Sequence, residues 1–132
     1  MTKRATIAGA EPVLFVTDIK RACDFFAIKL GFSLAFTWGE PAFYAQVRRD
    51  TARLNLRHVD RPVIDPHVRD REQLPAAALT VATADDIRAL FREFQATGVV
   101  FFQPFKTEPW GAQTFIVGDP DGNLLVFAGP AN

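Results

Sequence analysis

The chain repeats its own pattern. An apolar run at 11–17 precedes a stretch of helical spacing that ends at Gly31, and 76–82 precedes a similar stretch that ends at Gly98. Asp50–Leu56 is likewise echoed by Asp121–Phe127. The matching pieces lie about 70 residues apart, which is typical of an internal structural repeat. The sequence therefore predicts two similar units, each a strand, a helix and three more strands.

Each predicted helix has an apolar stripe and a polar N-terminal signal. Thr17 or Asp18 can cap the first helix, and Thr83 with Asp86 resembles a capping box at the start of the second. The stripes consist of Ile19, Ala22, Cys23, Phe26 and Leu30 in the first helix and of Ile87, Leu90, Phe91 and Phe94 in the second. These positions predict two helices that each bury one face.

The remaining apolar runs predict strands at 32–37, 43–48 and 52–58 in the first unit and at 99–102 in the second. A hairpin follows within 110–127, where Pro120 and Gly122 suit a tight turn. Segment 59–75 contains three prolines and many charges, and 103–108 contains Pro104, so both are expected to be loops.

The length of 132 residues indicates a single α+β domain, 1–132, with modules at about 10–58 and 76–128 joined by loop 59–75. Each module is expected to cover one face of a four-stranded sheet with its helix. The uncovered faces together would form a concave cleft, which is a natural ligand site.

Composition narrows the possible partners. Lys plus Arg and Asp plus Glu both number 15, so the formal charge is zero and nucleic acid is not expected as a partner. No apolar run is long enough to cross a membrane, and no secretory signal is visible. The single cysteine, Cys23, cannot form an internal disulfide, so a cytoplasmic setting is expected.

Several short stretches resemble the vicinal oxygen chelate superfamily, which includes glyoxalase, bleomycin resistance proteins and dioxygenases, and they resemble its bleomycin-resistance branch most. These stretches are Pro12–Asp18, Phe25–Phe26 with Leu30–Phe32, Leu54–Leu56, Glu108–Gly111 and Asp119–Asn123. The resemblance implies two paired βαβββ modules, whose eight strands form half-barrels around a cleft. It also implies a homodimer in which the two copies exchange structural elements, with ligand clefts at the subunit interface.

Enzymes of this superfamily hold a divalent metal with His, Glu or Gln side chains on four strands. Counting from the matched motifs places those positions on Glu11, Asn55, Ala76 and Val126, of which the last two offer no donor atom. The only histidines are His58, which has the opposite strand parity to Asn55, and His67 in the predicted loop. We therefore expect no metal and no cofactor. Glu11 is either a lone base or a salt-bridged carboxylate.

No catalytic residues are predicted. The only serine, Ser33, lacks a nucleophile-elbow context, and Cys23 lacks a neighbour that would activate it. Together with the resemblance to bleomycin resistance proteins, this predicts a metal-free binding protein that sequesters a partly aromatic antibiotic or metabolite in a cleft at the dimer interface. The alternative is a lyase, isomerase or dioxygenase of the same superfamily with a displaced metal site.

The expected cleft is apolar and aromatic. Strand parity places on it Glu11, Val13, Phe15, Asn55, Arg57, Ala76, Ala78, Thr80 and Val126. The predicted ligand-binding residues are Phe36, Trp38, Phe43, Asn55, Arg57 and Trp110. Rings of this kind stack on planar ligands. A neutral chain with an arginine in its cleft suits a neutral or anionic aromatic ligand better than a polycation. The alternative use of these rings is packing at a dimer interface.

Overall fold

The computed structural model describes residues 2–131, so Met1 and Asn132 of the predicted domain lie outside the described residues. The first module contains β1 (Val13–Val16), α1 (Ile19–Leu30), β2 (Ser33–Trp38), β3 (Tyr44–Arg49) and β4 (Ala52–His58). The second contains β5 (Ala77–Thr80), α3 (Ala84–Ala96), β6 (Phe101–Thr107), β7 (Gln113–Gly118) and β8 (Leu124–Gly129). Between them lies α2 (Pro66–Glu72).

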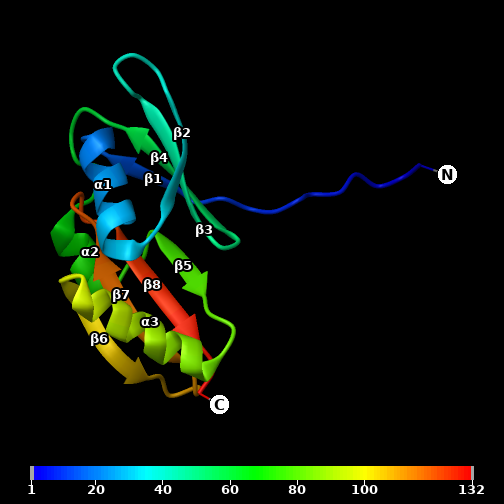
Figure 1. The fold of residues 1–132 in the computed structure, drawn as a ribbon, viewed down its shortest axis with the longest axis vertical. Coiled ribbons are helices and arrows are strands. Elements are labelled where there is room, and N and C mark those ends of the chain that lie inside the picture. Colours follow the sequence, from blue (N-terminus) through cyan, green and yellow to red (C-terminus); the bar gives the residue numbers. More distant parts are fainter. Residues whose placement is uncertain (1, 132) are drawn as a thin grey trace.

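The two modules share one topology, which confirms the predicted α+β repeat. The strand orders are β1-β4-β3-β2 and β5-β8-β7-β6, and in each sheet the first and fourth strands of the module pair in parallel. Figure 1 shows α1 against the upper sheet and α3 against the lower one. Residues 2–10 form no regular structure and extend away from the body (Figure 1).

The helix caps explain where α1 and α3 begin. The Asp18 carboxylate accepts from the Arg21 backbone N–H at 3.0 Å, and the Thr83 hydroxyl accepts from that of Asp86 at 3.0 Å. Each cap satisfies an N–H that the first helical turn leaves free. Gly31 ends α1 in the left-handed region with φ of 70°, where glycine has no steric penalty.

Two connecting segments differ from their prediction. Segment 59–75 is not a loop throughout, because Asp65 caps α2 by accepting from His67 and Val68, and Pro66 occupies its first turn. The expected loop at 103–108 is mostly strand, since β6 continues to Thr107. Pro104 is tolerated there because β6 is an edge strand whose pairing shifts register around it.

One continuous core joins the modules. It contains Leu14 and Phe26 from the first module and Phe94 and Phe115 from the second, all buried. Polar contacts reinforce this packing: the Lys29 ammonium donates to the Thr97 carbonyl at 2.8 Å. None of the helices within residues 2–131 is both long and apolar enough to span a membrane.

Candidate functional site

The face of each sheet that its own helix leaves uncovered is called here the open face. On β1 and β4 of the first sheet, Leu14, Val16, Leu54 and Leu56 are buried in the core. The alternate residues point the other way, because successive strand side chains alternate between faces. Val13 pairs with Asn55, and Phe15 pairs with Arg57. The register therefore places the predicted residues Asn55 and Arg57 on the open face of the first sheet.

Three polar side chains meet on this face. The Glu11 carboxylate accepts from the Gln46 amide at 3.2 Å and from the Asn55 amide at 3.1 Å, and Gln46 also donates to Asn55 at 2.9 Å. Gln46 and Asn55 are both 9% exposed. The buried amides are thus satisfied by each other and by the carboxylate, as buried polar groups require. Glu11 is hydrogen-bonded, and the guanidinium of Arg53 lies 3.8 Å away.

Gln46 was absent from the predicted site. The signal that could have found it is the hairpin register, since Gln46 on β3 lies directly opposite Asn55 on β4. Tyr44 is found in the same way, because it lies opposite Arg57. Arg48 and Arg53 are a third such pair. The open face therefore carries more polar and charged groups than sequence parity on β1 and β4 alone indicated.

Aromatic side chains lie on the same face along β2, the edge strand of the first sheet. Phe36 pairs with Gln46, and Trp38 pairs with Tyr44, so both rings share the open face. Phe36 is 46% and Trp38 68% exposed. The Arg57 guanidinium lies 4.8 Å from the ring centroid of Phe43, which is cation–π distance. Large exposed rings beside polar groups are typical of binding surfaces.

The open face of the second sheet carries aliphatic side chains and no aromatic ring on β5, β7 or β8. Ala78 pairs with Val126, and Val126 pairs with Ile116. Thr114, on the neighbouring part of β7, donates to the Glu108 carboxylate at 2.9 Å. Trp110 lies just beyond Glu108 in the turn before β7 and is 76% exposed. The six predicted ligand-binding residues are thus divided: four lie on strands of the first sheet, Phe43 lies just before β3, and Trp110 belongs to the second module.

The donor set at the four superfamily metal positions does not fit such a metal centre. Glu11 and Asn55 lie together and offer oxygen atoms, but these already accept hydrogen bonds within the pair and from Gln46. Ala76 and Val126 have hydrocarbon side chains and cannot coordinate a cation. Within residues 2–131, no group of three His, Cys, Asp or Glu side chains converges on one point.

The remaining sequence candidates lie elsewhere. His58 has the parity of Leu56 and packs its ring 6.2 Å from that of Phe43. His67 lies in the first turn of α2 rather than in a loop. Cys23 faces the core, and burial raises the pKa of its thiol, which disfavours the nucleophilic thiolate.

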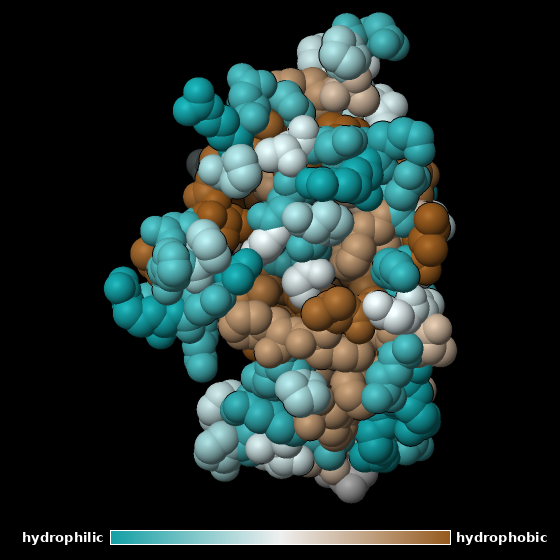
Figure 2. Space-filling view, turned by 90° about the vertical axis from the view of Figure 1, so that its left-hand side faces the viewer, coloured by the Kyte–Doolittle hydropathy of each residue, from teal (hydrophilic) through white to brown (hydrophobic). Residues whose placement is uncertain are grey.

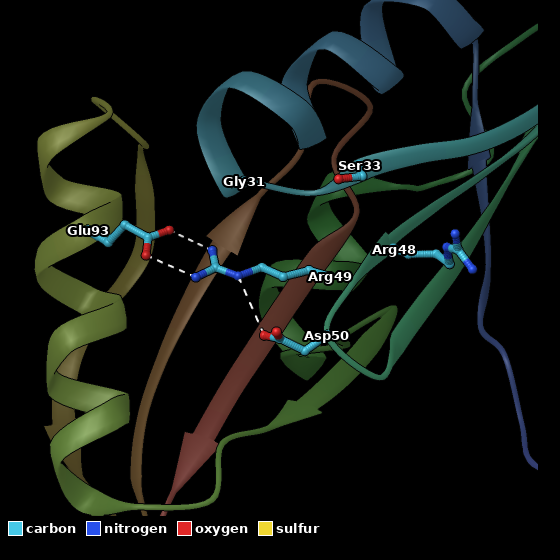
Figure 3. A pocket seen from close by; sticks show the side chains of 6 residues that line it. All are labelled: Gly31, Ser33, Arg48, Arg49, Asp50 and Glu93. Carbon is cyan, nitrogen blue, oxygen red and sulfur yellow. Dashed lines mark hydrogen bonds and ion pairs between the residues drawn. The ribbon is translucent and has the colours of Figure 1, made fainter.

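Further hollows lie at the edges of the sheets and between the modules. Figure 3 shows one at the junction of the modules, where Arg49 on β3 reaches Glu93 on α3. Their hydrogen bonds measure 2.5 and 2.9 Å. Another is a shallow hollow lined by Phe25, Val100 and Phe102, with Val100 81% exposed. Figure 2 views the side of the molecule where α2 and β6 lie and shows apolar side chains reaching the surface between hydrophilic ones.

Comparison with known proteins identifies the family. The model described as "Glyoxalase/Bleomycin resistance protein/Dioxygenase superfamily" matches residues 7–127. Because this match covers most of the chain, the protein belongs to that superfamily. A comparison with curated protein sequences gave no match.

Solved structures agree with this fold. A glyoxalase/bleomycin resistance protein/dioxygenase from Alicyclobacillus acidocaldarius has a TM-score of 0.76 at 20% identity, covering 93% of this chain and 91% of that one. A bleomycin-binding protein from Streptomyces verticillus, complexed with copper(II)-bleomycin, has a TM-score of 0.72 at 26% identity, covering 94% and 97%. Lactoylglutathione lyase from Agrobacterium tumefaciens has a TM-score of 0.70 at 15% identity, covering 96% of each chain. Neighbours this diverse show the fold and not one activity.

Proposed function

We propose that this protein binds a small, partly aromatic molecule reversibly, in a cleft shared by two copies of the chain. The row of exposed rings on the open face of the first sheet carries the proposal. Phe15, Phe36 and Trp38 lie beside the hydrogen-bonded group of Glu11, Gln46 and Asn55. Flat rings supply stacking area, and a few fixed polar groups supply orientation, which is the usual make-up of a small-molecule site.

A homodimer completes the proposed cleft. In one copy of the chain, Val13, Phe15, Phe36 and Trp38 remain substantially exposed, which is costly for large apolar side chains. A second copy that presents the open face of its second sheet, with Ala78, Val126 and Trp110, would cover them. Sequestration then consists of burying the ligand between two sheets, with no bond made or broken. The Streptomyces verticillus relative, whose structure contains bleomycin, supports binding as the activity.

Tryptophan emission tests this proposal because Trp38 and Trp110 are the only tryptophans. We would titrate the protein with neutral 4-nitrobenzamide and with bleomycin, using Trp110→Phe and Trp38→Phe to read each ring separately. Saturable quenching by 4-nitrobenzamide in both single-tryptophan variants is expected. Quenching that rises linearly, as it does for free N-acetyltryptophanamide, would overturn the proposal.

The second candidate is an enzyme of the glyoxalase or dioxygenase type with a displaced metal site. The observation that favours it is the position of Glu11, a carboxylate on the open face next to two amide side chains. Metal analysis of the purified protein separates the two candidates. A stoichiometric Zn, Ni, Mn or Fe ion would favour the enzyme, and a metal-free protein that still binds aromatics would favour sequestration.

A further inference from the structure

We infer that Arg48 and Arg53 form an anion-binding pair on the open face of the first sheet and hold the acidic group of an aromatic ligand. This inference rests on the proposed function and names the class of ligand. Arg48 on β3 and Arg53 on β4 are directly opposite each other. Cross-strand partners have Cβ atoms about 5 Å apart, and like charges in that position repel. Figure 3 shows Arg48 on the other side of β3 from Arg49.

The two arginines differ from their neighbour Arg49 in their partners. Arg49 is neutralised by Glu93 through two hydrogen bonds. Across residues 2–131, no carboxylate lies within 4.0 Å of the Arg48 guanidinium. Arg53 has only Glu11 at 3.8 Å, and that carboxylate already accepts hydrogen bonds from Gln46 and Asn55. The repulsion between Arg48 and Arg53 is therefore only partly offset.

The open face of the first sheet carries a net positive charge. The strand register places Arg48, Arg53 and Arg57 on this face, and Glu11 joins them there through its hydrogen bonds to Gln46 and Asn55. A polycation would be repelled from this surface, although the chain as a whole is neutral. A carboxylate or similar oxyanion would relieve the repulsion, since guanidinium groups bind planar anions through paired hydrogen bonds.

The rings define the rest of the ligand. On the open face, Phe36 of β2 lies opposite Gln46, two residues along β3 from Arg48, and Trp38 lies one position further from the arginine pair, opposite Tyr44. A flat ring system stacked on Phe36 would direct an acidic substituent along β3 toward Arg48 and Arg53. The geometry thus indicates a compact aromatic acid rather than a neutral aromatic or an aliphatic acid.

Isothermal titration calorimetry with a matched pair of compounds tests the inference. The compounds are 2-naphthoate and 2-naphthamide, which share the ring and differ in charge. We expect the acid to bind the wild-type protein about tenfold more tightly, as charge-assisted hydrogen bonds imply. The Arg48→Gln/Arg53→Gln variant should lose that advantage and keep its affinity for the amide. Arg92→Gln removes an exposed arginine of α3 and should leave both affinities unchanged.

Each outcome has a separate meaning, provided that circular dichroism shows the variants folded. Equal affinity for acid and amide in wild-type protein overturns the anion-binding pair and leaves the proposed function standing. An acid advantage that survives in the double variant also overturns the pair. If neither compound binds, the proposed function and the pair both fail.

Discussion

Asp121 joins the two modules through a single side chain. Its Oδ1 accepts from the Thr17 backbone N–H at 2.9 Å and from the Thr17 hydroxyl at 2.7 Å, and its side chain is only 3% exposed. Arg21 lies 3.4 Å from the same oxygen. The carboxylate therefore fixes the start of α1 against the turn between β7 and β8.

Replacing Asp121 with alanine should destabilise the protein by about 1–3 kcal/mol, because two partly buried donors of Thr17 lose their acceptor. Urea unfolding measures this change. The control is Asp24→Ala, which removes an exposed pair with Lys20 and should cost less than about 0.5 kcal/mol. Equal effects of the two substitutions would show that Asp121 does not connect the modules.

The ion pair of Arg49 and Glu93 makes the stability of the junction between the modules depend on pH. The hydrogen bonds from Arg49 lower the pKa of the Glu93 carboxyl below its ordinary value of 4.5. A lowered folded-state pKa means that the contribution of Glu93 to stability is complete above pH 4.5 and is lost as the pH falls through the lowered pKa.

We expect Glu93→Gln to cost less than about 1 kcal/mol at pH 7, because both groups are partly exposed. That cost should shrink as the pH is lowered below 4.5, the ordinary value for this group. Urea unfolding of wild-type and variant protein across this range measures the difference. A cost that stays constant with pH would contradict this account.

Helix α3 packs closely on β8 at Gly129, whereas Gly118 on β7 has free space beside it. A Cβ at Gly129 would lie 2.8 Å from the Ile87 Cβ and 3.0 Å from its Cγ2, so α3 would have to move away. A Cβ at Gly118 would meet only the Leu124 Cδ2, at 3.8 Å. Gly129→Ala should therefore destabilise the fold by about 1–3 kcal/mol, as overpacking does. Gly118→Ala should be far milder, and thermal unfolding of the two variants compares them.

Local sequence signals predicted some elements well and others poorly. The stripes around Phe26 and Phe94, with caps at Asp18 and Thr83, were sufficient for α1 and α3 because helical spacing and caps are local. Helix α2 had a local signal too, Asp65 followed by Pro66, but the charged and proline-rich surroundings obscured it. The predicted strand ended at Phe102, whereas β6 continues to Thr107. Proline normally breaks a strand, and Pro104 is tolerated only because β6 lies at the edge of its sheet.

The candidate site was harder to predict because it depends on register. Strand alternation placed Asn55 and Arg57 together, and β1 was aligned with them through Val13 and Phe15. Gln46 and the opposed arginines required the pairing of β3 with β4, which the sequence does not state residue by residue. Strand register depends on turn geometry as well as on the alternation of side chains, so alternation within single strands was not sufficient to find these residues.

The proposed homodimer makes its own prediction. Phe15 lies on the open face of β1 and is 41% exposed, so Phe15→Glu would place a charge in the shared cleft. Sedimentation velocity should show a wild-type dimer and a Phe15→Glu monomer. Val100→Glu adds the same charge away from the open faces and should leave the dimer intact. A wild-type protein that sediments as a monomer at every concentration would remove the second copy from the proposal.

Backbone amide chemical shifts of isotopically labelled protein, followed during titration with 2-naphthoate, locate the ligand on the molecule. If the ligand binds in the proposed cleft, the shifts will concentrate on β2, β3 and β4, including Trp38 and Arg53, and on the facing residues Val126 and Trp110, and they will saturate. Shifts confined to the hollow around Val100 and Phe102, or no saturable shifts at all, would contradict the account.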